Sequence, residues 1–186
     1  PYRRQRQMCI RDSFLTVEFD IAVRPGQTIT AKGYDDVEFL ISTNPGESLK
    51  PLSQVASGGE LSRIMLAIKT VLAGRDEIDT LIFDEIDTGI SGRTAWKVAE
   101  QLSVLSGAHQ VICITHLPQI AAMADVHFII EKSSTDDMTI TDIHKVAEEE
   151  SLAELARLLG SDALTEAALS NAKEMKEQAN GFKEAR

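Results

Sequence analysis

Two adjacent glycines directly before a long apolar-periodic segment constrain this chain more than any other feature. Ser57-Gly58-Gly59-Glu60 opens the run ELSRIMLAIK, and the spacing of its apolar residues predicts a helix that begins at the glycines. Backbone N–H groups at a helix start have no intrahelical partner, and with the helix dipole they attract anions. The stretch therefore predicts a phosphate site. The alternative is a capping box between Ser57 and Glu60, with Gly74 closing the helix.

The predicted helix runs from Gly58 to about Ala73. Its apolar residues form one stripe, which Arg63 and Lys69 do not join, so we expect both cations to face solvent. For Arg63 a surface salt bridge is preferred over a phosphate contact. The stripe consists of Leu61, Ile64, Met65, Ile68, Val71 and Leu72.

Two apolar strands that end in polar residues follow this helix. Leu81–Glu85 ends in the acids Asp84 and Glu85, and Val111–His116 ends in Thr-His. Ligands of α/β sheets bind at the carboxyl ends of strands, so this pattern is typical of a nucleotide site. Because side chains alternate along a strand, the two acids point to opposite sides and can hold different roles, one toward magnesium and one toward water.

Three motifs in this order resemble the C-terminal half of an ATP-binding-cassette (ABC) ATPase: SGGE, then LIFDE with DTGISG, then ITH. The finer wording, VASGGELSRIMLAIK with FDEIDTGISG and ITHLPQIAAMAD, resembles the RecN family of bacterial DNA-repair proteins, relatives of the structural-maintenance-of-chromosomes (SMC) ATPases. The resemblance implies an α/β fold: the C-terminal lobe of an ABC/SMC-type ATPase head, with a mostly parallel sheet flanked by helices and an antiparallel edge. It covers residues 14–186. Residues 1–13 are arginine-rich and do not match, so we interpret them as a disordered or foreign tail rather than a nucleic-acid-binding arm.

The resemblance also implies roles for single residues, and ATP with Mg²⁺ as cofactors. Asp84 would serve the magnesium shell, through water. Glu85 would orient and deprotonate the attacking water, and His116 would sense or stabilise the γ-phosphate. Two groups would face a second head: the signature Ser57, Gly58, Gly59 and Glu60, which reaches its ATP, and the dimer-interface loop with Asp87, Gly89, Ser91 and Gly92.

A P-loop needs Gly-Lys followed by Ser or Thr, and the dipeptide Gly-Lys never occurs in this chain. By resemblance, the nucleotide grip then lies upstream, in an N-terminal lobe across a coiled coil. We therefore expect an ATPase that is active only with that lobe, forms an ATP-dependent homodimer and acts in recombinational repair of double-strand breaks. The alternatives are an ABC transporter ATPase fragment, or a catalytically silent interaction module that kept the fold.

Composition limits the partners that this chain can have by itself. Its 186 residues suffice for one domain with a full core. The net charge of −10 argues against strong DNA binding by this part alone, so DNA contact would come through the full-length protein. No apolar run approaches a membrane span and no signal peptide opens the chain, so a cytoplasmic, nucleoid-associated protein without membrane contact is expected. Cys9 and Cys113 offer neither a disulfide framework nor a metal spacing.

The remaining elements are predicted from their periodicity. A strand over Phe14–Val23 would turn at Arg24–Gln27 and pair with a strand over Val37–Ser42. Two strands near the end would form a β-hairpin on the sheet edge. The other predicted elements are a helix over Arg93–Leu105, a short helix from Pro118 to about Ala124, the hairpin strands Val126–Glu131 and Met138–Val146, a helix that stops at Gly160, and a last helix from Leu164 to Phe182.

Overall fold

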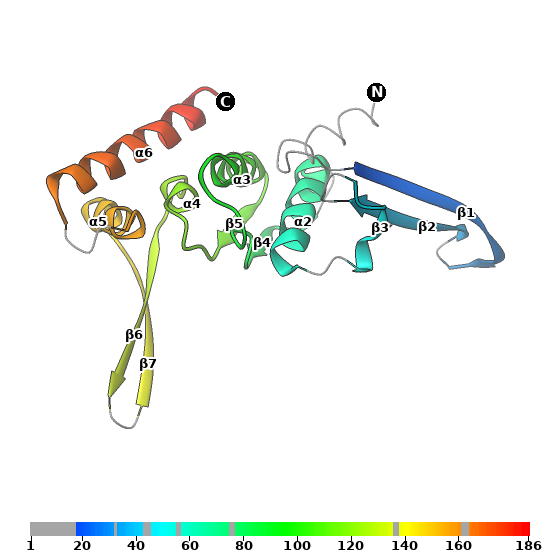
Figure 1. The fold of residues 1–186 in the computed structure, drawn as a ribbon, viewed down its shortest axis with the longest axis horizontal. Coiled ribbons are helices and arrows are strands. Elements are labelled where there is room, and N and C mark those ends of the chain that lie inside the picture. Colours follow the sequence, from blue (N-terminus) through cyan, green and yellow to red (C-terminus); the bar gives the residue numbers. More distant parts are fainter. Residues whose placement is uncertain are drawn as a thin grey trace. The chain divides into compact units, whose positions relative to one another are not determined.

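The computed structural model describes residues 18–31, 33–42, 46–54, 57–74, 77–135, 138–160 and 164–186 (Figure 1). The predictions for the tail 1–13 and for the strand start at Phe14 lie outside these residues. The chain divides into two compact units, one of residues 1–89 with 108–113 and one of residues 90–107 with 114–186. Their positions relative to one another are not determined, so each is described by itself. Among the helices of the described ranges, none combines the length and the apolar character that a membrane crossing requires.

The first unit begins with a three-stranded antiparallel sheet of β1 (Glu18–Thr30), β2 (Gly33–Ser42) and β3 (Lys50–Pro51). Its apolar face carries Phe19 opposite Ile41 and stacks Phe19 on Phe39 with ring centroids 5.9 Å apart. The turn predicted at Arg24–Gln27 is wrong, because β1 continues through these residues with a register shift between Pro25 and Thr30. An edge strand tolerates Pro25. A Cβ on Gly26 would overlap the carbonyl oxygen of Tyr34, so this glycine permits a close strand approach instead of a turn.

Helix α2 (Gly58–Leu72) follows the short 3₁₀ helix η1 (Leu52–Gln54) and leads to β4 (Thr80–Phe83). β4 pairs in parallel with β5 (Gln110–Cys113), with Phe83 opposite Cys113. His109 Nδ1 lies 2.6 Å from the carbonyl oxygen of Ile78, which fixes the start of this pair. Each strand exposes one apolar side chain to solvent, Ile82 in β4 and Ile112 in β5.

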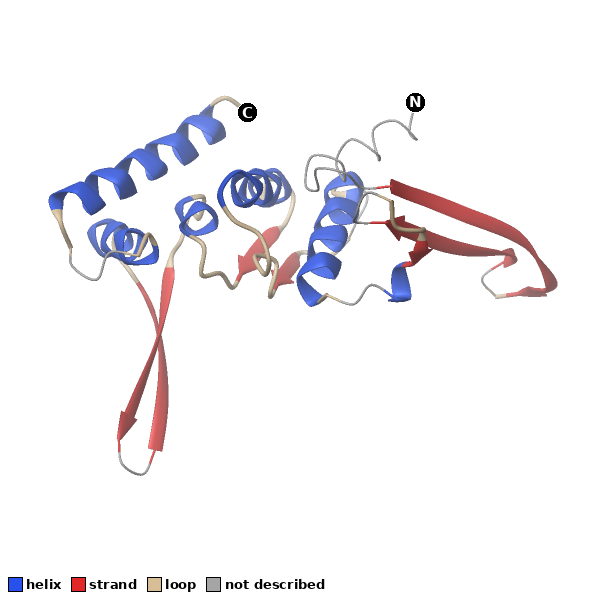
Figure 2. Cartoon of the chain, in the orientation of Figure 1, coloured by secondary structure: helices blue, strands red, loops and turns tan. Residues whose placement is uncertain are grey.

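The second unit consists of helices and one hairpin (Figure 2). Helix α3 (Gly92–Leu105) packs on α4 (Pro118–Ala122), which in turn contacts α5 (Glu148–Leu158) and α6 (Glu166–Glu184). Pro118 begins α4 as predicted, because its fixed φ suits a first helical turn. The core of these helices is built largely from small residues, and those with no exposed surface include Ala95, Val98, Ala99, Leu105, Ala122, Leu155, Ala156, Ala172 and Ala179.

The predicted hairpin is confirmed as β6 (Phe128–Thr135) paired antiparallel with β7 (Met138–Lys145). The two strands pair only with one another in the described residues, and they extend away from the helices of their unit (Figure 1). Their expected place on an edge of the parallel sheet is therefore not observed. The α/β class itself is confirmed, with one parallel pair, antiparallel strands and flanking helices.

Candidate functional site

The helix start and the acidic strand tip predicted from sequence lie together in the first unit. Ser57 is extended, with φ −107° and ψ 126°, and α2 begins at the next residue. Its side chain makes no capping hydrogen bond, so the predicted capping box with Glu60 is not formed. Gly74 follows the C-cap Ala73 at the predicted place, but it is not among the glycines with positive φ, so it does not end α2 in the left-handed conformation. The backbone N–H groups at the start of α2 therefore receive no hydrogen bond from the Ser57 side chain.

Glu85 lies directly against both signature glycines. A Cβ on Gly58 would overlap Oε2 of Glu85 and would lie 3.6 Å from its Cδ. A Cβ on Gly59 would lie only 2.9 Å from the backbone oxygen of Glu85 and 3.0 Å from Cβ of Thr88. The double glycine is therefore required by the close approach of the loop after β4, and any side chain there would push this loop away.

Two side chains of α2 hold the loop in place. Ser62 Oγ donates to the carbonyl oxygen of Asp84 at 2.9 Å. Arg63 Nη1 donates to the carbonyl oxygens of Ile86 at 3.0 Å and Thr88 at 2.9 Å. A guanidinium carries several N–H groups in a fixed planar arrangement, so the Arg63 side chain can bind two carbonyl oxygens of the loop at once.

Arg63 was predicted to face solvent, and this prediction is wrong. Only 4% of the residue is exposed. Burial lowers the pKa of its guanidinium, while the nearby Glu60 and Asp87 raise it. Arg63 stands one helical turn after Gly59, and this spacing was the available signal, because both residues then lie on the helix face that meets the loop.

The acids themselves adopt an unusual turn. Glu85 has φ +57°, a left-handed conformation that non-glycine residues rarely adopt. Its backbone N–H donates to Asp84 Oδ1 at 2.9 Å, and its carbonyl oxygen accepts from the N–H of Thr88 at 3.0 Å. Both acidic residues are exposed, whereas the following Ile86 and Asp87 are buried. This turn presents two carboxylates at the end of β4 and anchors the residues behind them.

An exposed carboxylate at a strand tip fits the predicted magnesium role of Asp84. Mg²⁺ keeps several waters and binds one or two carboxylates together with substrate phosphates. The described residues contain no cluster of three or more acids, histidines or cysteines that could hold a metal by themselves. Asp84 thus fits an ion that arrives together with phosphate groups.

The predicted dimer-interface loop divides between the units. Asp87 is buried and Gly89 has φ +75°, a conformation that favours glycine. Ser91 and Gly92 belong to the second unit, where Ser91 precedes α3 in an extended conformation without a side-chain capping bond. Gly92 has φ +52°. Left-handed glycines at both ends shape this segment.

His116 lies in the second unit, in the loop between β5 and α4, and it is exposed. The adjacent Thr115 accepts a 3.0 Å hydrogen bond from the backbone N–H of Leu117 through its Oγ1. The first unit therefore contains most of the predicted site residues: Ser57, Gly58, Gly59, Asp84 and Glu85. His116 belongs to the second unit, whose position relative to the first is not determined.

Cys113 ends β5 behind the acids. Burial, with Asp87 and Asp84 as further causes, raises the pKa of its thiol to about 12. The thiol therefore stays protonated at neutral pH, which excludes it as a thiolate nucleophile.

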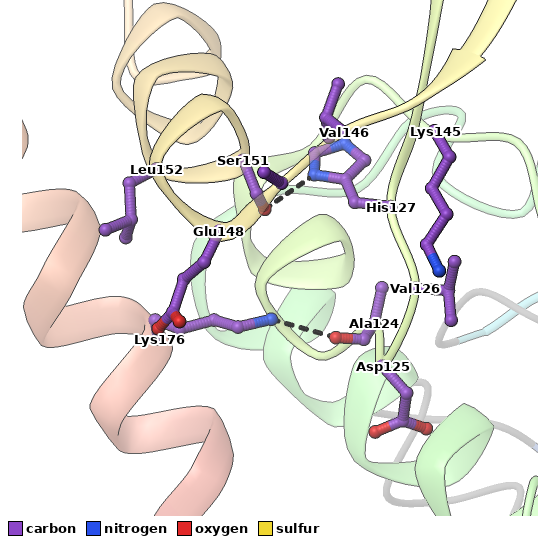
Figure 3. Close-up of a pocket in the computed structure, with 11 residues that line it drawn as sticks. Ala124, Asp125, Val126, His127, Lys145, Val146, Glu148, Ser151, Leu152 and Lys176 are labelled. Atoms are coloured by element: carbon purple, nitrogen blue, oxygen red, sulfur yellow. Dashed lines mark hydrogen bonds between the residues drawn. The ribbon is translucent and has the colours of Figure 1, made fainter.

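A pocket of about 210 Å³ in the second unit was not predicted from the sequence (Figure 3). His127 Nδ1 and Ser151 Oγ are 2.9 Å apart across it, and Lys176 donates to the carbonyl oxygens of Ala122 at 3.1 Å and Ala124 at 2.8 Å. Burial lowers the pKa of both His127 and Lys176. These contacts join the residue before β6 to α5, and they join α6 to the end of α4 and the segment after it, so the polar groups hold the unit together.

The curated proteins that are similar to this chain in sequence include several DNA repair proteins named RecN. The chain is 42% identical over 178 residues to the DNA repair protein RecN of Halalkalibacterium halodurans, which covers 96% of this chain and 32% of the relative. It is 48% identical over 155 residues to RecN of Bacillus subtilis (83% and 27%), and 54% identical over 143 residues to RecN of Treponema pallidum (77% and 25%). The chain thus spans between a quarter and a third of these curated relatives. No protein-family model matches it.

Solved structures show the same fold at low sequence identity. The Smc head domain with a coiled coil and joint from Pyrococcus yayanosii matches with a TM-score of 0.59 at 20% identity, over 83% of this chain and 28% of that one. A structure from work on ATP-driven dimerization and DNA-stimulated activation of SMC ATPases matches with a TM-score of 0.53 at 19% identity, over 86% and 92%. Both place this chain in the SMC-type ATPase head fold.

Proposed function

This chain belongs to the RecN family of DNA repair proteins, and from that membership we propose that it supplies the hydrolytic and partner-facing part of a composite ATP site. The observation that carries the proposal is the junction in the first unit, where the double glycine at the start of α2 meets the acidic turn after β4. The same junction joins a helix start suited to phosphate with the two carboxylates suited to metal and water.

Each residue has one role in the proposed site. Glu85 would orient the attacking water and accept a proton from it, and Asp84 would hold Mg²⁺ through a water. ATP, when bound, would supply the γ-phosphoryl group, and Mg²⁺ would offset the charge that develops on it. To His116 we assign the sensing or stabilisation of the γ-phosphate. Phosphoryl transfer depends on positioning and charge stabilisation, so these roles require few side chains.

The site is completed by polypeptide from outside this chain. Gly-Lys is absent from the 186 residues, so we assign the phosphate grip to an N-terminal lobe of the same protein. The signature Ser57, Gly58, Gly59 and Glu60 would reach ATP held by a second head. The loop with Asp87, Gly89, Ser91 and Gly92 would line the head–head interface. The ATP-driven dimerization of an SMC ATPase with the same fold supports this arrangement.

Recombinational repair of DNA double-strand breaks is the process that we propose for the whole protein, in the cytoplasm and at the nucleoid. Because DNA is bound mainly through Lys and Arg at its phosphates and this chain has a net charge of −10, we assign the DNA contact to the rest of the polypeptide. The curated relatives are named as DNA repair proteins, which favours this function over a transporter ATPase. A catalytically silent interaction module remains the alternative that an assay of hydrolysis decides.

Hydrolysis by the reassembled head tests the proposal. This chain is coexpressed with the upstream part of its protein, and phosphate release is compared for wild type, Glu85→Gln and the exposed-acid control Glu77→Gln. Glu85→Gln should lower turnover by about 10²-fold or more while ATP-dependent dimerization persists, because water activation is lost and binding is kept. Glu77→Gln should leave turnover unchanged. Equal turnover of wild type and Glu85→Gln would remove Glu85 from the mechanism, and absence of hydrolysis in the wild-type assembly would favour the silent module.

A further inference from the structure

We propose that Lys176 of α6 is a positioning residue for His116, because it fixes one end of α4 while the other end continues into the loop that carries the histidine. This inference rests on the proposed function, in which His116 senses or stabilises the γ-phosphate of ATP. It adds a residue that touches no nucleotide and acts only through α4. His116, α4 and α6 belong to the second unit, so the contacts that join them lie within one compact unit.

Helix α4 is too short to hold its conformation by itself. It has five residues, Pro118–Ala122, whereas isolated helices shorter than about 12 residues are marginal in water. It is held by its packing on α3, α5 and α6 and by the groups that bind its two ends. Because a helix of this length spans only about 7 Å, a group that fixes one end also fixes the direction of the chain at the other.

Lys176 binds the C-terminal end of α4 from a distant part of the sequence (Figure 3). Its ammonium donates to the carbonyl oxygens of Ala122 at 3.1 Å and Ala124 at 2.8 Å, and the residue is half-buried. The last carbonyl groups of a helix lack intrahelical partners and carry partial negative charge, so a cation stabilises them. Lys176 therefore acts as the C-terminal cap of α4.

The helix that carries Lys176 is itself anchored at further points. Lys183 pairs with Asp125 at 2.6 Å, and Arg186 donates to the carbonyl oxygen of Ser103 in α3. Lys176 and Lys183 are seven residues apart and so lie on the same face of α6. The ammonium that caps α4 thus comes from an element with a fixed position in its unit.

At the other end of α4, a hydrogen bond encloses His116. The backbone N–H of Leu117 donates to Oγ1 of Thr115 at 3.0 Å, across the histidine. The carbonyl oxygen of Leu117 accepts from the N–H groups of Ile120 and Ala121, each at 3.1 Å. The backbone on both sides of His116 is therefore bonded into the start of α4.

The series of hydrogen bonds continues through α4 to Lys176. The carbonyl oxygen of Ala121 accepts from the N–H of Ala124 at 3.1 Å, and the carbonyl oxygen of Ala124 is one of the two that Lys176 binds. Removal of the ammonium would release the end of this series. The loop with His116 should then change its position relative to the rest of the unit.

A small displacement of His116 is enough to affect hydrolysis. Phosphoryl transfer depends on the placement of charged groups around the γ-phosphate, and a misplacement of about 1 Å can lower a rate by about 10²-fold. The grip on the nucleotide is assigned to the N-terminal lobe. Loss of Lys176 should therefore lower kcat and leave the KM for ATP nearly unchanged.

Hydrolysis by the reassembled head provides the first test. kcat and the KM for ATP are measured for wild type, Lys176→Met, Lys176→Arg and Lys173→Met, the last at an exposed lysine of the same helix as the matched control. Lys176→Met should lower kcat about three- to tenfold and change KM by less than about twofold. Lys176→Arg should restore most of the loss, because a guanidinium can also donate to both carbonyl oxygens. Lys173→Met should have no effect.

A double variant separates positioning through His116 from a general loss of stability. In a His116→Ala background, Lys176→Met should lower kcat no further, since two residues that act through one group are not additive. Losses that multiply in the double variant would overturn the inference, as would wild-type kcat in Lys176→Met or in His116→Ala. None of these results changes the outcome for Glu85→Gln, so this inference and the proposed function can fail separately.

NMR follows the loop without hydrolysis. The histidines of this chain are labelled with ¹³C at Cε1, and the chain is assembled with its unlabelled upstream part. The His116 resonance should shift in Lys176→Met and not in Lys173→Met, while that of His144 in β7 stays in place in both. Lys176→Gln takes the place of Lys176→Met if the methionine variant does not fold.

A His116 resonance that is the same in wild type and in the Lys176 variants would overturn the inference, whatever the rates of hydrolysis. Absence of hydrolysis in the wild-type assembly would instead count against the proposed function. The resonance would then still decide whether Lys176 controls the position of the histidine.

Discussion

Ser62, in the second turn of α2, donates a 2.9 Å hydrogen bond from its hydroxyl to the backbone carbonyl oxygen of Asp84, 22 residues further along the chain. The bond joins the helix that begins with the signature glycines to the strand tip that carries both acids. Together with the two bonds of Arg63, it makes the acidic turn a fixed extension of α2. Changes on one side of this junction should therefore be measurable on the other.

Ser62→Ala should loosen the acidic turn. Loss of one partly exposed hydrogen bond should lower the free energy of unfolding by about 1 kcal/mol. Amide exchange of Thr88, whose N–H donates to the carbonyl oxygen of Glu85, should accelerate. Thr70→Ala is the matched control, because that hydroxyl bonds only to Leu66 in its own helix. An unchanged exchange rate of Thr88 in Ser62→Ala would show that the bond does not restrain the turn.

Arg63→Met should destabilise the chain more strongly. The substitution leaves the carbonyl oxygens of Ile86 and Thr88 without their charged donor and should cost about 2–3 kcal/mol, measured by urea unfolding. Lys97→Met, which removes an exposed lysine paired with Glu100 at 2.8 Å, should change stability by less than about 0.5 kcal/mol. Equal effects of both substitutions would contradict the anchoring role of Arg63.

The ingredients of the site could be predicted from the sequence, but their contacts could not. The glycines before an apolar-periodic helix and the acids after an apolar strand are local patterns, and both were confirmed as a helix start and a strand tip. Glu85 lies against Gly58, and this contact joins two segments that α2 and β4 separate in the sequence. Local patterns do not report such a contact. Arg63 was misplaced for the same reason, because its partners are carbonyl oxygens, which every residue carries and no sequence pattern marks.

In the fold as well, local patterns could be predicted from the sequence, whereas features that depend on tertiary contacts could not. Helices α3, α5 and α6 and the β6–β7 hairpin follow from periodicity, and Gly160, with φ +87°, ends its helix as predicted. The turn at Arg24–Gln27 failed because proline and glycine also serve edge strands and close backbone approaches. The exposure of Ile82 in β4 could not be predicted, because an apolar sequence does not report what covers a strand.

His127 should make stability depend on pH. Burial lowers its pKa below the ordinary value of 6.5, with Lys176 acting in the same direction and Glu154 in the opposite one. Below that value the unfolded chain binds the proton more readily than the folded chain, so stability falls as the pH decreases. Urea unfolding between about pH 7.5 and about pH 5 should show a loss in wild type that is smaller in His127→Gln. His144→Gln, at a half-buried histidine of β7, is the control, and identical pH dependence of all three proteins would contradict the assignment.

Cys113 should resist alkylation in the folded chain. With a thiol pKa raised to about 12, roughly one molecule in ten thousand carries the reactive thiolate at about pH 8, against roughly one in ten at the ordinary value of 9.0. A Cys9→Ser background leaves Cys113 as the single thiol. Labelling by iodoacetamide, followed by mass spectrometry, should then be slower by about a thousandfold without urea than in unfolding urea. Rapid labelling of the folded chain would show that the end of β5 opens to solvent, and with it the packing behind Asp84 and Asp87.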